Sequence, residues 1–341
     1  MSKKKGVFNV IFLIVIFLAT VYYVFHEEDI GELLDYIQMA DARCWIFAIA
    51  LVIMFILGES VIIHYLFKTV GQHIKFKRCC LYSFVGFFFS SITPSATGGQ
   101  PMQIVYMKKD DIPVALSSYL LVLVTIGYKM VLVLLGLAIL IVRPIKIMMY
   151  LEPVKGWCIL GIVLNVIVVG GMFLLLFNTR LAEMILRGIL WLGLKIHVFK
   201  NREKWERSIR SLVERYDHVS EYLTQNPRVA FNVLGLSIIQ RFLLFAVTAV
   251  VYLSFGLQGT SLVTIILLQG MISVAVDMLP TPGGMGVSEG LFLSIFESVF
   301  GEFTLPGMVV SRGISFYSQL FICMIMTVVA HFIILDNRKK G

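Results

Sequence analysis

The sequence predicts an all-α polytopic membrane protein. Of its 341 residues, 58% are hydrophobic and only 15% are charged, a composition typical of chains that cross a bilayer repeatedly. Several apolar runs of about 20 residues are long enough to span the hydrocarbon core as helices. Two further apolar stretches are interrupted by prolines and paired glycines. We therefore expect about seven or eight transmembrane helices plus re-entrant or broken half-helices, in a single integral membrane domain over residues 1–341.

Each long apolar run is interpreted as a crossing. The first run follows Lys3, Lys4 and Lys5, has no small-residue cleavage site, and is interpreted as an uncleaved helix rather than a signal peptide. Residues 81–92 are apolar but too short to cross, so we interpret residues 81–107 as re-entrant, entering and leaving on the inner side. The crossings lie at 7–25, 44–67, 114–142, 156–177, 229–253, 261–279 and 305–335, with a shorter apolar helix at 287–300.

The distribution of charge predicts the orientation. The net charge of +8 is attributed to basic loops on the inner side and to anionic lipid headgroups, and no nucleic-acid partner is expected. Both termini carry lysines and are expected on the cytoplasmic side. Residues 178–228 hold ten Lys/Arg and six Asp/Glu. They form a cytoplasmic amphipathic loop, interpreted either as a helix on the anionic inner leaflet or as a soluble helix packed on the inner loops.

Two broken stretches organise the chain. Proline removes backbone donors and glycine permits unusual dihedral angles, so no continuous helix runs through them. Backbone at membrane depth that is not helical has to be buried in protein or line a polar cavity. Two such stretches in corresponding halves indicate a transport site. The expected path residues here are Pro94, Thr97, Gly98, Gly99, Gln100 and Gln103 in the first stretch and Pro280, Thr281, Pro282, Gly283, Gly284, Ser288 and Glu289 in the second.

The two stretches also suggest an internal repeat. Residues 81–103 and 269–289 each contain an apolar half-helix, a proline, a Gly-Gly pair and a polar residue four or five positions later. We expect repeat halves at 1–155 and 156–341. Whether they are inverted in the membrane does not follow from the sequence.

Six charged residues fall within or beside apolar spans: Glu59, Lys129, Arg241, Asp277, Glu289 and Arg312. A charge at mid-bilayer costs about 2.5–3.5 kcal/mol on insertion scales, so these side chains are expected to face the protein interior. One interpretation makes Lys129–Glu59 or Arg241–Asp277 buried pairs that fix helix packing. The other gives them a ligand.

The functional interpretation assigns a part of the ligand to the basic residues and another part to the acidic residues. Arg241, Arg312 and Lys129 suit a phosphate, helped by free N–H groups of half-helix N-termini after the glycine pairs. The acidic members suit a cationic headgroup. A site with both signs favours a zwitterionic or aminoacylated phospholipid. No metal, cofactor or catalytic residue is expected, because the five cysteines show no ligand spacing and no nucleophile–base arrangement is evident.

Three segments carry a resemblance to a known family. Residues 91–101 (SITPSATGGQP), 279–290 (LPTPGGMGVSEG) and 311–317 (SRGISFY) resemble the lysylphosphatidylglycerol synthase transmembrane family. This family is the membrane half of the multiple peptide resistance factor. The resemblance covers nearly the whole chain. It implies a membrane half that flips aminoacylated phosphatidylglycerol and a separate cytosolic transferase domain that makes this lipid.

The resemblance leaves three functions open. Only six residues follow Leu335, so the soluble catalytic domain is expected to be absent. The first function is a translocase for phosphatidylglycerol or its lysyl derivative in the bacterial plasma membrane, contributing to resistance against cationic antimicrobial peptides. The second is the phosphatidylglycerol lysyltransferase of the family label, or a partner subunit of one. The third is a scaffold that binds anionic lipid. A separate lysyltransferase subunit and a homodimer are further expected partners.

Overall fold

The computed structural model describes residues 40–178 and 225–336, together with a few isolated positions between 35 and 221. The first expected span, 7–25, and nearly all of the 178–228 loop lie outside these residues. Helices and short turns make up the described chain, which contains no strand. The prediction of an all-α polytopic membrane protein is confirmed.

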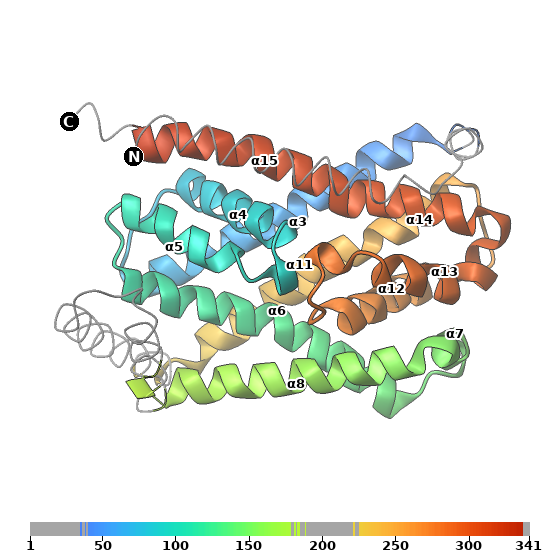
Figure 1. Cartoon of the computed structure of the whole chain (residues 1–341), viewed down its shortest axis with the longest axis horizontal. Helices are drawn as coiled ribbons and strands as arrows, with labels where there is room; N and C mark the ends of the chain where they lie inside the picture. Colours follow the sequence, from blue (N-terminus) through green and yellow to red (C-terminus); the bar gives the residue numbers. More distant parts are fainter. Residues whose placement is uncertain are drawn as a thin grey trace.

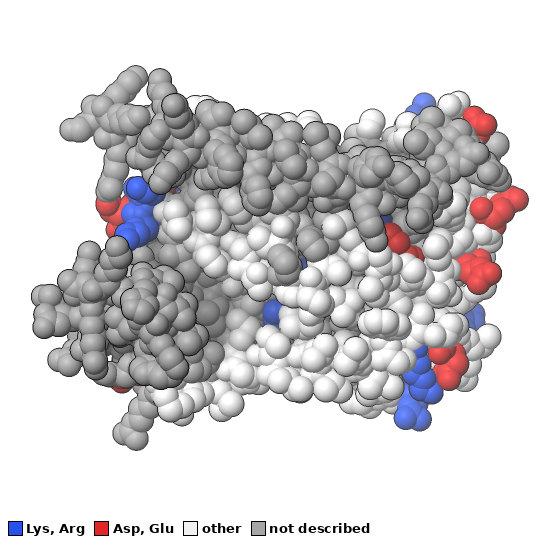
Figure 2. Space-filling view, in the orientation of Figure 1, with Lys and Arg blue, Asp and Glu red and all other residues white. Residues whose placement is uncertain are grey.

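Five described segments are long and apolar enough to cross a membrane: Ala42–Thr69, Val114–Val142, Ile145–Leu174, Pro227–Ser254 and Val287–Ile334. Their helices run along the long axis of the molecule (Figure 1). On the face shown in Figure 2, most charged side chains lie near the two ends of this axis, and the band between them is largely uncharged. This arrangement places the hydrocarbon core around the middle of the long helices.

Four long helices and one composite helix form the frame. The long helices are α3 (Ala42–Thr69), α6 (Val114–Val142), α8 (Lys155–Phe177) and α11 (Pro227–Ser254). The composite helix joins α14 (Thr304–Arg312), the π-helical turn η5 (Gly313–Ser318), α15 (Gln319–Ala330) and η6 (His331–Asp336). Helix starts follow local chemistry: Asp41 caps α3 by accepting a hydrogen bond from Arg43 N at 2.8 Å, and Pro227 occupies the first turn of α11.

The first broken stretch forms a hairpin of α4 (Phe76–Ser91), the turn η1 (Pro94–Ala96) and α5 (Gly99–Lys109). Both of its helices lie toward the end where α3 ends and α6 begins, at the left of Figure 1. We call this the α5 end. A 16-residue helix is about 24 Å long, shorter than a bilayer core of about 30 Å. The prediction that residues 81–107 turn back within the membrane is therefore confirmed.

The second broken stretch forms a matching hairpin of α12 (Leu262–Val276), η3 (Pro282–Gly284) and α13 (Val287–Phe300). Its helices lie toward the opposite end, at the right of Figure 1, where α3 begins and α6 ends. We call this the α13 end. There α13 contacts α7 (Ile145–Leu151) and the turn η2 (Glu152–Val154).

The expected crossing at 261–279 is therefore wrong. Helix α12 has only 15 residues, about 22 Å, and the prolines that follow it stop the helix in the middle of the molecule. Helix α13 then returns to the same end. The described part of the chain thus has fewer crossings than the sequence analysis assigned to it.

The two hairpins enter from opposite ends, and their tips η1 and η3 meet in the middle. The broken stretches are thus related as an inverted pair, which the sequence did not reveal. The boundaries of the repeat halves remain a prediction. Apolar clusters support both hairpins: Phe292, Phe296 and Phe300 of α13 are buried in one, and Tyr82 and Tyr106 of the first hairpin in the other.

Candidate functional site

A cavity of about 250 Å³ lies where the two hairpin tips meet. The long helices α3, α6 and α11 and the composite last helix complete its wall, so it lies near mid-membrane. Its lining is unusually polar for a membrane interior. The predicted path residues that line it are Gln100, Gln103, Arg241, Asp277, Thr281, Gly283, Gly284 and Arg312.

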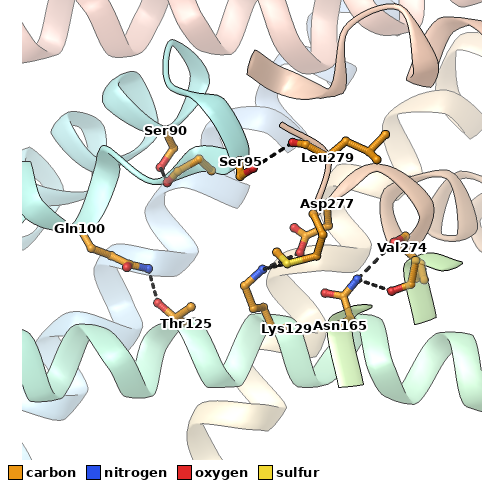
Figure 3. Close-up of polar contacts among 12 residues, drawn as sticks. Ser90, Ser95, Gln100, Thr125, Lys129, Asn165, Val274, Asp277 and Leu279 are labelled. Atoms are coloured by element: carbon orange, nitrogen blue, oxygen red, sulfur yellow. Dashed lines mark hydrogen bonds and ion pairs between the residues drawn. The ribbon is translucent and has the colours of Figure 1, made fainter. Parts of the chain in front are cut away.

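Lys129 and Asp277 form an ion pair beside the cavity. Lys129 Nζ lies 2.6 Å from Asp277 Oδ2, and the two side chains are only 7% and 17% exposed. Figure 3 shows the lysine reaching from α6 to the end of α12. The pairings Lys129–Glu59 and Arg241–Asp277 considered from sequence are wrong, because the fold brings Asp277 to Lys129. A cation there also complements the negative end of the α12 dipole.

Arg312 and Glu289 form the second ion pair, at the tip of the second hairpin. Arg312 Nε donates to Glu289 Oε1 at 2.8 Å, and Arg312 Nη2 donates to the carbonyl of Gly283 at 3.0 Å. Ser288 Oγ donates to the other carboxylate oxygen at 2.8 Å. The arginine thus ties the π-helical region of the last helix to η3 and to the first turn of α13.

Glutamines of the first hairpin bond to the long helices. Gln103 Nε2 donates to Glu59 Oε1 of α3 at 2.7 Å, and Gln100 donates to the hydroxyl of Thr125 in α6 (Figure 3). Glu59 forms no ion pair with the described residues. In the cavity wall its carboxylate is therefore held by an amide rather than by a cation of the described residues.

Arg241, also in the wall, makes no direct ion pair with the part of the chain that the structure describes. Its guanidinium lies over the ring of Tyr128, 4.4 Å from the centroid, and 5.6 Å from that of Phe55. Its Nε is buried and has no hydrogen-bond partner among the described residues. The charges of Arg241 and Glu59 attract each other without direct contact. Lys129 and Arg312 are thus paired, whereas Arg241 retains donor capacity toward the cavity.

Thr281 supplies another unmatched group. It lines the cavity from the second tip, and its hydroxyl is buried without a partner among the described residues. Buried polar groups normally find a partner in protein or water. Arg241 and Thr281 therefore both have donors available to a hydrogen-bond acceptor in the cavity.

The tips themselves contain strained backbone. Ser95 and Ala96 have φ of 50° and 54°, unusual for residues other than glycine. Ser95 Oγ donates to the carbonyl of Leu279 at 3.1 Å, which joins η1 to the turn before η3.

Two N–H groups of the glycine pairs are bonded within the tips, and free N–H groups at the helix starts after the pairs stay a prediction. Gly98 N donates to Thr93 Oγ1 at 2.9 Å, and Gly284 N donates to the carbonyl of Thr281 at 3.2 Å. A side chain at Gly99 would lie 2.1 Å from Ser90 Oγ and 2.7 Å from the carbonyl of Gly86. Gly99 therefore permits close packing of α5 on α4.

The other predicted residues lie around the cavity without lining it. Lys129 and Glu289 pair with the lining residues Asp277 and Arg312, and Ser288 bonds to Glu289. Thr97 and Pro280 are exposed at the tips, and Pro94 and Pro282 begin the turns η1 and η3.

Several lining residues were not in the predicted set. They include the polar residues Glu59, Thr125, Tyr128, Gln240, Thr248 and Gln269. Glu59 was identified as an intramembrane charge but not placed on the path. Each of the others is a polar residue within an apolar run, and this pattern could have identified them. Nothing in the sequence showed that the helices carrying them face one cavity.

These features define a class: a multi-pass helical membrane protein with two opposed re-entrant hairpins around a polar cavity. The chain belongs to the family described as lysylphosphatidylglycerol synthase TM region, whose sequence model matches residues 10–323. This confirms the family expected from the three motifs and supports a role connected with membrane lipid. No curated protein matches the chain.

Proposed function

We propose that the protein is a phospholipid translocase that moves phosphatidylglycerol or its lysyl derivative between leaflets. The observation that carries this proposal is the guanidinium of Arg241, which makes no ion pair with the described residues. It lies in a polar cavity near mid-membrane, between hairpins from opposite ends. A headgroup cannot cross hydrocarbon without replacing its lost hydration. A cavity with charged and hydrogen-bonding walls supplies that replacement.

The chemistry of the wall suits a headgroup of both signs. Arg241 has donors for a phosphodiester oxygen, and arginine binds such oxygens with fixed geometry. The hydroxyl of Thr281 is a second donor. Glu59, which forms no ion pair among the described residues, suits an ammonium group such as that of a lysyl ester. Gln100 and Gln103 add amide groups from the first hairpin.

The setting follows from the family and from charge. We propose a bacterial plasma membrane, with the α5 end on the cytoplasmic side because Lys68, Lys75, Lys77 and Arg78 lie there. Lysyl-phosphatidylglycerol delivered to the outer leaflet would make the cell surface less negative. Such a change weakens the binding of cationic antimicrobial peptides.

A vesicle assay tests the proposal. The purified protein is reconstituted with fluorescent phosphatidylglycerol or lysyl-phosphatidylglycerol, and accessibility to a membrane-impermeant quencher is followed over time. We expect faster equilibration between leaflets than in protein-free vesicles, and loss of this acceleration in Arg241→Gln. The control is Ile167→Ala, which alters a residue that is 63% exposed on α8 and away from the cavity.

Two other results would redirect the assignment. Equal rates with and without folded protein, for both lipids, would contradict translocation and favour a lipid-binding scaffold or a partner of a separate lysyltransferase. Release of lysine or formation of a new lipid by the purified protein would instead indicate a transferase.

A further inference from the structure

Helix α8 forms most of the span Ile145–Leu174, the least buried of the five candidate spans. None of the residues found to line the cavity belongs to α8. Val163, Val166 and Ile167 are 48%, 42% and 63% exposed, as expected for a face against lipid. Asn165 lies among these residues in sequence yet is completely buried. An amide inside a lipid-facing helix needs a hydrogen-bond partner.

The partner of Asn165 is the end of α12. Its Nδ2 donates to the carbonyl of Gly161 at 2.9 Å and to the carbonyl of Val274 at 3.2 Å (Figure 3). The last carbonyls of a helix lack intrahelical partners. Beyond α12, Asp277 N bonds to Ser273 O and Leu279 N to Val276 O. The amide of Asn165 therefore caps the carbonyl of Val274, one of the two carbonyls between them.

Backbone contact between the two helices supports this cap. A side-chain carbon at Gly161 would lie 2.4 Å from the carbonyl oxygen of Val274 and 2.6 Å from the Cα of Ala275. Only glycine permits so close an approach. Helix α8 therefore lies directly on the last turn of α12, and Asp277 is the next residue after that helix.

The amide is a poor means of stabilising the fold by itself. Its Oδ1 is buried without a hydrogen-bond partner among the described residues. Leucine has a similar size. Replacing Asn165 with leucine removes the unmatched Oδ1 but leaves the carbonyl of Val274 without its hydrogen-bond donor. The two effects oppose each other, so the main consequence is a less constrained α12 end.

We propose that Asn165 is a positioning residue that fixes the end of α12, and with it Asp277 and Met278, against Lys129 in the cavity wall. Only the expected effect of Asn165 on lipid transport rests on the proposed function. Met278 reports the position directly, because its Sδ lies 3.8 Å from Lys129 Nζ.

The first test does not depend on transport. The five native cysteines of the full-length protein are replaced by serine or alanine, and Met278→Cys is introduced. The rate at which a small water-soluble methanethiosulfonate labels the new thiol is then measured. Adding Asn165→Leu is expected to raise the labelling rate by about three- to tenfold, the range of an interhelical hydrogen bond in membranes. Asn165→Ser keeps a bond to its own helix but not the reach to α12, and is expected to behave like leucine. Val166→Leu, on the exposed face, is the matched control and should not change the rate.

The second test uses vesicles as above. Asn165→Leu is expected to slow translocation by about three- to tenfold, and Gly161→Ala to do the same by pushing α8 away. In an Asp277→Asn background, Asn165→Leu should not lower the translocation rate further. If Asn165→Leu caused an independent packing defect, the two reductions in rate would multiply.

Unchanged labelling of Met278→Cys in both Asn165→Leu and Gly161→Ala would overturn the proposal. So would translocation rates in which the losses of Asn165→Leu and Asp277→Asn multiply in the double variant. If the parent protein moves no lipid, the proposed function fails, and the labelling rates still decide the role of Asn165. If Asn165→Leu does not fold, Gly161→Ala and Asn165→Ser provide the same comparison.

Discussion

The hydroxyl of Ser95 donates a hydrogen bond to the carbonyl of Leu279, 3.1 Å away and 184 positions later in the chain. This bond joins the tips of two hairpins that enter from opposite ends. Each tip turns back before crossing, so the junction stands between the two ends of the molecule. Movement at this junction would be needed for a headgroup to pass from one side of it to the other.

Linking the tips should stop transport. In a background without native cysteines, Ser95→Cys and Leu279→Cys place thiols on opposite sides of the junction. We expect a short bifunctional thiol reagent to cross-link them and to arrest lipid translocation, while the uncross-linked pair stays active. The measurement is the quencher assay before and after treatment, with each single cysteine as control. Full activity in cross-linked protein would show that the tips need not separate.

Replacing one member of the Lys129–Asp277 pair should destabilise the protein more than replacing both members. Both side chains are mostly buried, and a buried charge left alone destabilises a protein by about 3–5 kcal/mol. We expect Lys129→Met and Asp277→Asn each to lower the unfolding temperature in detergent clearly. The double variant Lys129→Met with Asp277→Met should recover most of the loss. Equal or greater destabilisation in the double variant would contradict a direct charge pair.

Arg241 should be sensitive to shape as well as to charge. Lysine keeps the positive charge but loses the planar group that lies over Tyr128. We expect Arg241→Lys to retain part of the translocation rate and Arg241→Leu to retain almost none. Tyr128→Phe preserves the ring and should be close to wild type, whereas Tyr128→Leu should fall about two- to fivefold, consistent with a cation–π contribution of about 0.5–1 kcal/mol. Equal rates for Arg241→Lys and the wild type would show that only charge matters.

Two glycines should respond differently to compensating changes. A side chain at Gly283, where φ is +61°, would lie 2.2 Å from the ring of Phe316. Gly283→Ala should destabilise by about 1–3 kcal/mol, and Phe316→Leu should recover part of this. Gly99→Ala also collides with a backbone carbonyl, that of Gly86, so Ser90→Ala should not rescue it. Thermal unfolding in detergent measures both. Rescue of Gly99→Ala by Ser90→Ala would mean that the α4–α5 contact is looser than the structure shows.

Much of the architecture follows from local sequence properties. Hydrophobic length predicts the long helices, because an apolar run of about 20 residues is stable in hydrocarbon only as a helix. The re-entrant nature of residues 81–107 follows from the shortness of α4 and from Pro94. The same reasoning failed at residues 261–279, because the apolar run before Pro280 was long enough to be taken for a crossing. Only the return of α13 to the same end showed otherwise.

The sequence by itself determined that the chain is a helical membrane protein, that it is broken at two related stretches, and that charges are buried beside them. These properties depend on residue type, length and spacing, which the bilayer constrains directly. The tertiary structure alone decided that the hairpins are inverted, that Lys129 pairs with Asp277 and Arg312 with Glu289, and that Arg241 makes no direct ion pair among the described residues. Partners in each pair lie tens to hundreds of residues apart, and the energy of a buried charge depends on which neighbour folding brings within a few ångströms.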